Sequence, residues 1–184
     1  MSHPRSSVTP LSLLTPEDFP ALAALAGLIW RAHYIPIIGA AQVDYMLAQR
    51  TAPEAMAAYV GAADRWLHLW REAAEGVDLG TTAKGALVGY CSHSELPDPR
   101  EMKLEQLYVR PDRQGRGIGA RMLGFVEDNA RARGRDRLVL TVNRHNTGSI
   151  AFYRRAGFEV REAARFDIGQ GYFMDDFIMV KSLI

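Results

Sequence analysis

The sequence predicts a mixed α/β fold in which helices flank a largely antiparallel central sheet of about six to seven strands. Two observations predict it: strand-length apolar or alternating runs recur along the chain, and amphipathic runs of helical length lie between them. No internal repeat or low-complexity linker interrupts this order. Because 184 residues fit one compact core, we expect a single domain over 1–184, with residues 1–7 flexible.

The N-terminal half is predicted to be mainly helical. Thr15 is a typical N-cap residue, Pro16 suits the first helical position, and the apolar spacing that follows continues to about Tyr34. Pro36 and Gly39 then predict the end of this helix. The other elements expected here are a strand over 8–13, helices over 41–49 and 53–59, and a strand over 66–70 whose residues could also continue a helix.

A strand, a glycine-rich loop and a long helix are predicted at the centre of the fold. The strand covers 102–109, and the helix over 117–133 places Ile118, Met122 and Val126 on one apolar face. The remaining elements are expected to be a hairpin loop over 76–85, strands over 86–92, 137–142, 158–163 and 172–180, and a helix over 147–155.

The composition is typical of a cytoplasmic protein without disulfides. Hydrophobic residues make up 48% of the chain and charged residues 23%, and the polar stretch 1–9 does not resemble a signal peptide. We expect no apolar run to approach the ~20 residues that span a bilayer, and hence no membrane partner. The single Cys91 excludes an intrachain disulfide, and the histidines lack metal-ligand spacing, so we expect no metal.

Charge is segregated along the chain, although the net charge is only +1. Residues 110–165 contain 13 Arg against six acidic residues, a local charge of +7 that leaves −6 for the remainder. Such a segment predicts a polyanionic ligand, and the acidic remainder suits a cationic one. Nucleic acid is the competing polyanion. The arginines are interleaved with a helix core and no nucleic-acid-binding motif is present, so we expect no nucleic-acid partner.

The loop before the central helix carries the clearest functional signal. Its glycines at 115, 117 and 119 predict backbone angles closed to other residues and close approach of a ligand to the main chain. The helix N-terminus adds unpaired N–H groups and partial positive charge, which suit the two phosphates of a pyrophosphate, and Arg113 and Arg116 would reinforce it. By itself the loop could be a structural turn. It has neither the Lys-Ser or Lys-Thr of a nucleotide-hydrolysing loop nor a strand-first dinucleotide-binding unit.

Two motifs together resemble the GNAT superfamily of N-acetyltransferases. The segment from Gln114 to Gly119, Gln-Gly-Arg-Gly-Ile-Gly, is similar to the family's cofactor signature Gln/Arg-x-x-Gly-x-Gly/Ala after a strand. The segment from Asn146 to Phe158 is similar to its Asn-x-x-Ala-x-x-x-Tyr-x-x-x-Gly-Phe, with Ser149 where the family usually has Ala. The resemblance covers 87–180, whereas the N-terminal helices match only in outline.

The resemblance implies transfer of an acetyl group from acetyl-coenzyme A to a primary amine by direct attack. It leaves the acceptor open, a small molecule or a peptide, because acceptor pockets vary. The strand over 104–109 would pair with the pantetheine arm, and Asn146 would donate to the same arm or be a plain N-cap. The implied cofactor-binding residues are Leu107, Tyr108, Val109, Arg113, Gln114, Gly115, Arg116, Gly117, Ile118, Gly119, Ala120, Asn146, Ser149 and Tyr153.

Tyr153 is the candidate general acid. It lies two helical turns beyond Asn146 on the same face, and the resemblance implies that its hydroxyl protonates the departing thiolate of coenzyme A. Phe152 and Phe158 beside it have the character of packing residues, so a core tyrosine is the alternative interpretation.

Glu105 is the first candidate for the base that deprotonates the amine. Three further carboxylates are rivals: Glu101, Glu95 and Asp176. Because strand side chains alternate, Glu105 is expected on the face of Leu107 and opposite Leu104, unless a bulge intervenes. Asp176 would attract a cationic amine, or else be a solvated turn acid.

A non-catalytic acyl-coenzyme A-binding or sensing module is the alternative to an enzyme, because it would keep the cofactor loop without turnover. Cys91 could act as a nucleophile only with a paired histidine, which the sequence does not identify, so we expect no covalent intermediate. The sequence leaves the oligomeric state open, with a homodimer as one candidate assembly. The aromatic and Met side chains of the first two helices are expected to pack in the core or to cover the acceptor site: Trp30, Tyr34, Tyr45 and Met46.

Overall fold

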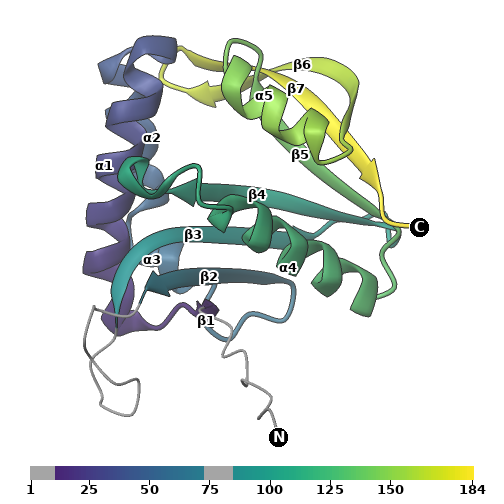
Figure 1. Cartoon of the computed structure of the whole chain (residues 1–184). Coiled ribbons are helices and arrows are strands. Elements are labelled where there is room, and N and C mark those ends of the chain that lie inside the picture. The colour runs from purple at the N-terminus through teal and green to yellow at the C-terminus, as the bar shows by residue number, and fades with distance from the viewer. Residues whose placement is uncertain (1–10, 73–84) are drawn as a thin grey trace, which may run out of the picture.

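A seven-stranded sheet forms the centre of the computed structural model, which describes residues 11–72 and 85–184. The strand order is β1-β2-β3-β4-β5-β7-β6, and every neighbouring pair is antiparallel except β4 and β5 (Figure 1). The predicted mixed α/β fold with a largely antiparallel sheet is therefore confirmed. The segment 1–7, expected to be flexible, lies outside the described residues, as does most of the loop expected over 76–85.

The predicted helices and strands all occur, with shifted ends. The stretch around Trp66 that could have continued a helix is a strand. The strands are β1 Leu11–Leu13, β2 Arg65–Glu72, β3 Ala86–Glu95, β4 Glu101–Val109, β5 Arg137–Asn143, β6 Glu159–Gly169 and β7 Tyr172–Ser182. The helices are α1 Phe19–Ile38, α2 Ala40–Arg50, α3 Pro53–Ala57, α4 Ile118–Ala132 and α5 Thr147–Arg155.

Helix α1 corrects two expectations. It continues to Ile38 with Pro36 inside it, because a proline near the end of a helix removes only one backbone hydrogen bond, and it ends at Gly39, whose φ is 81°. The segment Pro16–Ile38 has a mean hydropathy of 1.5 and is long and apolar enough to cross a membrane by length and composition. The expectation that no apolar run approaches this length was therefore wrong. Core helices of soluble proteins pass the same criterion, and one side of α1, including Leu22 and Ile29, is buried within the domain.

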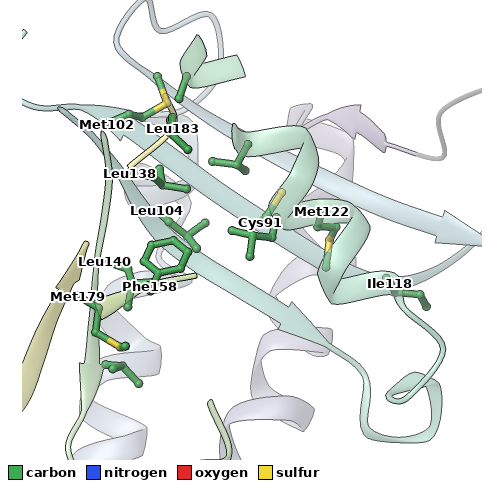
Figure 2. Packing of buried hydrophobic residues seen from close by; sticks show 14 of the residues in the cluster. Cys91, Met102, Leu104, Ile118, Met122, Leu138, Leu140, Phe158, Met179 and Leu183 are labelled. Carbon is green, nitrogen blue, oxygen red and sulfur yellow. The ribbon is translucent and has the colours of Figure 1, made fainter. Parts of the chain in front are cut away.

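The sheet separates two hydrophobic clusters. One lies between the sheet and helices α4 and α5, and contains the buried Met102, Leu104, Met122 and Leu140 (Figure 2). The other packs under α1, α2 and α3. Full burial of a Leu or Met side chain contributes roughly 1.5–3 kcal/mol. Strand β4 lies between these clusters and is therefore held from both faces.

Strand β4 has a bulge and a free edge, and both help to position the site. Its register with β3 shifts so that Ser92 opposes Gln106 and His93 opposes Leu104, which leaves Glu105 as the extra residue. The bulge places Leu104 against the same cluster as Leu107, so the simple alternation is broken at Glu105. On its other side β4 pairs with β5 only up to Leu104, and the two strands then diverge (Figure 1).

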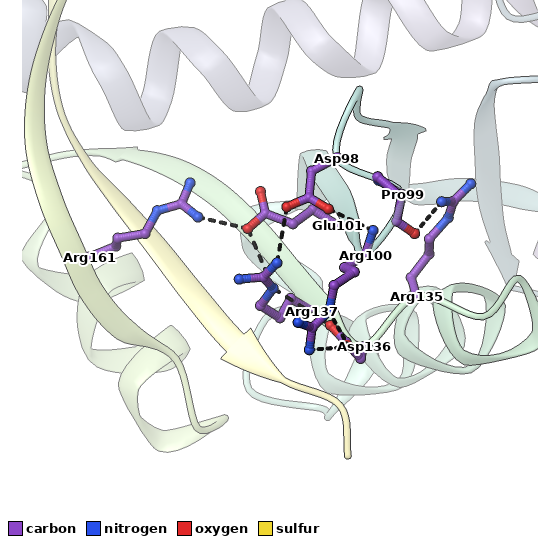
Figure 3. Close-up of polar contacts among 8 residues, drawn as sticks. All are labelled: Asp98, Pro99, Arg100, Glu101, Arg135, Asp136, Arg137 and Arg161. Carbon is purple, nitrogen blue, oxygen red and sulfur yellow. Dashed lines mark hydrogen bonds and ion pairs between the residues drawn. The ribbon is translucent and has the colours of Figure 1, made fainter.

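An ion-pair network joins the other, paired end of β4 and β5. The carboxylate of Glu101 is 7% exposed and accepts from Arg161 at 2.8 Å, with Arg137 at 3.6 Å (Figure 3). Arg137 also contacts Asp98 at 3.0 Å. Partnered charges at partly buried positions add specificity to packing rather than much free energy. This network fixes the closed end from which β4 and β5 separate.

Candidate functional site

A pocket of about 150 Å³ lies where β4 and β5 diverge. Its walls come from β4, β5, β7, α1, α2 and α5. The sequence-predicted residues that line it are Glu105, Leu107, Tyr108, Val109, Gln114, Asn146, Ser149 and Tyr153. The remaining predicted residues, from Gly115 to Ala120 and Arg113, lie beside it in the loop and the first turn of α4. Gln114 connects the two groups, because its Nε2 donates to the carbonyl of Val109 at 3.1 Å.

The free edge of β4 presents backbone donors to this pocket. The N–H of Arg110 donates to the Val88 carbonyl of β3 at 2.8 Å. Because alternate N–H groups of a strand point to opposite sides, those of Leu107 and Val109 point away from β3. Strand β5 does not pair with this part of β4. An extended ligand could therefore add to this edge as another strand would.

Two glycines of the loop adopt the left-handed conformation that the sequence predicts. The φ angles of Gly115 and Gly117 are 75° and 77°, and a Cβ at either residue would meet no atom within 4 Å. Gly119 differs from the prediction because it lies inside α4 without a positive φ. A Cβ there would make ordinary contacts at 3.8 Å with Phe152 and Val109. The open main chain is thus confined to Gly115 and Gly117.

The N-terminus of α4 lacks a side-chain cap. Gly117 occupies the N-cap position, and the first helical bond runs from the Arg121 N–H to its carbonyl at 3.0 Å. The N–H groups of residues 118–120 have no partner within the helix, which makes this end a suitable anion site. Arg116 is exposed beside it and makes no ion pair to the described residues.

Arg113 is engaged elsewhere than predicted. Its Nε contacts Glu72 at 3.0 Å and its Nη1 contacts Asp112 at 3.2 Å. Two carboxylates therefore already offset the positive charge that the sequence analysis assigned to the anion site. Arg113 can therefore contribute to anion binding through its backbone, or through its side chain once these ion pairs have opened.

Helix α5 contributes Asn146, Ser149 and Tyr153. Asn146 is buried and caps the helix by accepting from the Ser149 N–H at 3.3 Å, as the N-cap interpretation predicts. Tyr153 packs edge-on against Phe152 and Phe158. Burial, and to a smaller extent the nearby Tyr34, raises the pKa of Tyr153. Its hydroxyl stays protonated near neutral pH and can act as a proton donor.

Two carboxylates line the pocket, and their surroundings differ. Glu105 accepts from the Ser94 hydroxyl at 3.0 Å and pairs with Lys103 at 3.0 Å. Asp176 is 4% exposed, and its Oδ1 has no hydrogen-bond partner in the part of the chain that the structure describes. Burial, followed by the charge of Asp175, raises the pKa of Asp176 to about 6, against a lowering effect of Lys103.

The other two rival carboxylates lie outside the pocket. Glu101 belongs to the network at the closed end of the strands. Glu95 pairs with Arg135 at 3.0 Å and with Arg133 at 3.6 Å. Neither is placed to reach a ligand in the pocket.

Aromatic side chains of α1 cover one side of the pocket. The hydroxyls of Tyr34 and Tyr108 are 3.1 Å apart, and Trp30 Nε1 donates to the Tyr90 hydroxyl at 3.1 Å. Burial raises the pKa of Tyr34. Trp30, Tyr34 and Met46 line the pocket, and Trp30 and Met46 are also buried in the core.

Two residues of α2 depart from the sequence analysis. Tyr45 does not line the pocket, because its hydroxyl instead donates to the Ile168 carbonyl at 2.6 Å. Arg50 does line it, although the sequence analysis did not single it out. No motif surrounds Arg50, so only the packing of α2 against the sheet brings it there.

Cys91 lies in the core on the α4 side, and burial raises the pKa of its thiol to about 12, which leaves little nucleophilic thiolate. His68 and His93 stack nearby on β2 and β3, with ring centroids 5.5 Å apart. Within 11–72 and 85–184, no three His, Cys, Asp or Glu side chains are grouped as metal ligands.

Known proteins resemble the chain in both sequence and structure. The model of the acetyltransferase (GNAT) family matches residues 45–158. An L-methionine sulfoximine/L-methionine sulfone acetyltransferase of Pseudomonas paraeruginosa is 32% identical over 85 residues, which are 45% of this chain and 49% of the relative. The N-alpha-acetyltransferase RimI of Mycobacterium tuberculosis is 37% identical over 83 residues, 44% and 51% of the two chains. The matched segment thus spans about half the length of these curated relatives.

A solved structure shares the fold over nearly the whole chain. The PaiA N-acetyltransferase of Thermoplasma acidophilum, in complex with coenzyme A, has a TM-score of 0.72 and covers 94% of this chain and 98% of its own at 21% identity. At this identity the likeness concerns the fold. The family match is independent of it and covers more than half of the chain. The chain therefore belongs to the GNAT family of acetyltransferases.

Proposed function

We propose that the protein is an acetyl-coenzyme A-dependent N-acetyltransferase that acetylates a primary amine by direct attack. The observation that carries the proposal is the pocket between the diverging strands β4 and β5. It combines the unpaired edge of β4, the Tyr153 hydroxyl and, through Gln114, the uncapped N-terminus of α4. A linear ligand with an anionic end fits this arrangement.

The residues present fit coenzyme A along its length. The N–H groups of Leu107 and Val109 would bind the pantetheine arm, with Tyr108 between them and Asn146 opposite. The open main chain at Gly115 and Gly117 and the free N–H groups of Ile118, Gly119 and Ala120 would hold the pyrophosphate. Gln114, Arg116, the Arg113 backbone and Ser149 would complete the binding surface.

In the proposed reaction, acetyl-coenzyme A supplies an acetyl group activated as a thioester. Glu105, acting through a water molecule, takes one proton from the acceptor ammonium. The neutral nitrogen forms the new C–N bond as the C–S bond breaks, and Tyr153 gives its hydroxyl proton to the sulfur. The new amide nitrogen then loses its surplus proton, which returns to the Tyr153 oxygen through solvent. Tyr153 lines the pocket and its hydroxyl is protonated at neutral pH, which supports this role, although burial raises its pKa and so makes it a weaker acid in the protein without ligand.

The setting of this activity is proposed as well. We propose a single domain over 1–184 that works in the cytoplasm, as a monomer or homodimer, without nucleic-acid or membrane partners. One relative is named for L-methionine sulfoximine and L-methionine sulfone, and the other is named as an N-alpha-acetyltransferase. Both names indicate acetylation of an amine, which supports the proposed reaction class. The acceptor of this protein has to be inferred from the residues of its own pocket.

The reaction is tested with a panel of amines and acetyl-coenzyme A, by following the released thiol. Tyr153→Phe should lower kcat by about 100-fold or more while the Kd for coenzyme A in calorimetry stays within about twofold. Tyr172→Phe, whose ring packs on Tyr45 outside the pocket, is the matched control and should keep kcat. An unchanged kcat in Tyr153→Phe would remove Tyr153 from the mechanism. Tight coenzyme A binding without turnover of any amine would favour the sensing module.

The base is tested separately. Glu105→Gln should lower kcat on the same panel. If Glu105→Gln keeps the wild-type kcat, another group accepts the proton.

A further inference from the structure

Two opposite charges in the pocket have no role in the proposed reaction: Asp176 on β7 and Arg50 at the end of α2. We propose that they define the acceptor as a small zwitterion, a free amino acid whose ammonium group binds Asp176 and whose carboxylate binds Arg50. This inference rests on the proposed function, because it concerns the acceptor side of the same pocket.

Asp176 is a buried anion that lacks a partner. Its side chain is 4% exposed, and no donor in the described segments reaches its Oδ1. A buried polar atom of this kind costs free energy unless something satisfies it, and most such atoms in proteins are satisfied. Its neighbour Asp175 faces Arg144 and forms an ion pair with it. Asp175, outside the pocket, is therefore paired, as is Glu105 inside it, whereas Asp176 Oδ1 has no partner among the described residues.

Arg50 is the complementary charge. It lies in the last turn of α2, lines the pocket and makes no ion pair or hydrogen bond within the described ranges. Arg31, on the neighbouring α1, instead contacts Asp44 at 2.9 Å. A positive charge in the last turn of a helix interacts favourably with the helix dipole. This interaction explains why an arginine occurs at the end of α2, but not why its side chain lines the pocket. A guanidinium group binds a carboxylate through two parallel hydrogen bonds, which makes a carboxylate the fitting ligand.

Tyr34 lines the same pocket as these two charges and the proposed proton donor Tyr153. Asp176 and Arg50 both act on the pKa of Tyr34, in opposite directions. In the proposed binding mode the ammonium group binds Asp176 in this shared pocket, and the carboxylate binds the exposed Arg50.

The rest of the lining sets the size and polarity of the acceptor. Apolar side chains from three elements close the space around the charges: Trp30, Ile38, Met46 and Met174. The acceptor would share this pocket of about 150 Å³ with the end of the proposed cofactor, which favours a small acceptor. An amino acid with an apolar side chain matches the walls and both charges.

The test compares two acceptors that differ only in the carboxylate, leucine and 3-methylbutylamine. For the wild-type protein with acetyl-coenzyme A, kcat/KM should be about 10–100-fold higher for leucine, as expected for one charge-assisted contact. Arg50→Gln should bring this ratio down toward one, whereas Arg50→Lys should keep part of it. Asp176→Asn should raise KM for both amines and leave the Kd for coenzyme A unchanged. Arg31→Gln is the matched control and should keep the wild-type ratio.

Three outcomes would overturn the inference. They are equal kcat/KM for the two amines in the wild-type protein, an Arg50→Gln protein that keeps the leucine preference, and a clear preference for peptides with a free N-terminus over leucine. In each case the protein still acetylates amines, so the proposed function survives. Failure of every amine would instead contradict the proposed function itself.

Discussion

The two ends of the β4–β5 pair show how one sheet separates scaffold from site. At the closed end the strands are paired and the charges form ion pairs, as Glu101 does with Arg161 and Arg137. Arg135 Nε, Asp136 Oδ1 and Arg137 Nε are nevertheless buried there without a hydrogen-bond partner among the described residues. At the open end the strands diverge, and the groups without a partner in the described part of the chain include the β4 edge, Asp176 Oδ1 and Arg50. Polar groups that satisfy one another fix the geometry. Groups left without partners are available to a ligand.

The two ends should also differ in their effect on the stability of the folded chain. Partners at the closed end lower the free energy of the folded chain, whereas a buried carboxylate without a donor raises it. A site kept ready for ligands is therefore expected to destabilise the unliganded protein. Variants at the two ends should move stability in opposite directions.

The histidine pair of β2 and β3 is the strongest challenge to this comparison, because it has unpartnered atoms away from the pocket. Both ring nitrogens of His93 and the Nδ1 of His68 are buried without a hydrogen-bond partner among the described residues. Burial lowers the pKa of His68 to about 4, and burial together with the charges of His68 and Arg133 lowers that of His93 to about 3. The rings stack near Phe125 and Trp66, so this is a packed core.

We therefore expect a large loss of stability in acid. A histidine with a lowered folded-state pKa contributes stability above its unfolded value of 6.5, and that contribution is lost as the pH falls toward the folded value. Between pH 7 and pH 4 the free energy of unfolding should fall by several kcal/mol, because each tenfold difference in proton affinity between the folded and unfolded chain is worth about 1.4 kcal/mol. Urea unfolding at stepwise pH measures it, and His93→Phe should flatten the curve. If the wild-type curve is already flat, the pair is solvated in solution.

The second prediction compares Glu101→Gln with Asp176→Asn. Glu101→Gln should lower the free energy of unfolding by about 1–3 kcal/mol, because two partly exposed arginines lose their carboxylate. Asp176→Asn should raise the free energy of unfolding at pH 8 by about 1–3 kcal/mol. The pKa of the Asp176 carboxyl group is raised from 3.8 to about 6 in the folded protein, so the group destabilises the folded state increasingly as the pH rises from 3.8 to 6, and this effect is fully present at pH 8.

Chemical denaturation of both variants at pH 8 measures this contrast. Asp175→Asn, at the exposed ion pair with Arg144, is the control and should change stability by less than about 0.5 kcal/mol. Acetyl transfer should fall in Asp176→Asn and persist in Glu101→Gln. A stability loss in both would mean that Asp176 has a partner in solution.

Much of the fold was predictable because local patterns determine it. The order of strands and helices followed from apolar periodicity, and α5 matches the predicted range 147–155. The extent of α1 was not predictable, since Pro36 lies so close to the helix end that it removes only one backbone hydrogen bond. The bulge at Glu105 was foreseen only as an option, because it depends on how β3 and β4 pair.

In the candidate site, too, some residues could be identified from the sequence and others could not. Gly115, Gly117 and Asn146 were recognisable because their roles depend on the local backbone. Arg50 was not, because a helix and a sheet far apart in sequence bring it to the pocket. Likewise, the partners of Arg113 come from distant or irregular segments, so a count of arginines overstates the charge available to an anion.

The smallest expected effect concerns two glycines at and within helix α4, Gly117 and Gly124. Replacing each with alanine should change the free energy of unfolding in opposite directions. Gly117→Ala forces a Cβ into the left-handed region at φ 77° and should cost about 1 kcal/mol. Gly124→Ala, within the same helix with ordinary φ and no atom within 4 Å of the new Cβ, should stabilise by about 0.5–1 kcal/mol. Calorimetric Kd values for coenzyme A should weaken only in Gly117→Ala, because its methyl group would occupy the space proposed for the pyrophosphate. Equal affinities in the two variants would place the anion elsewhere on the protein, even if the stability changes have the expected signs.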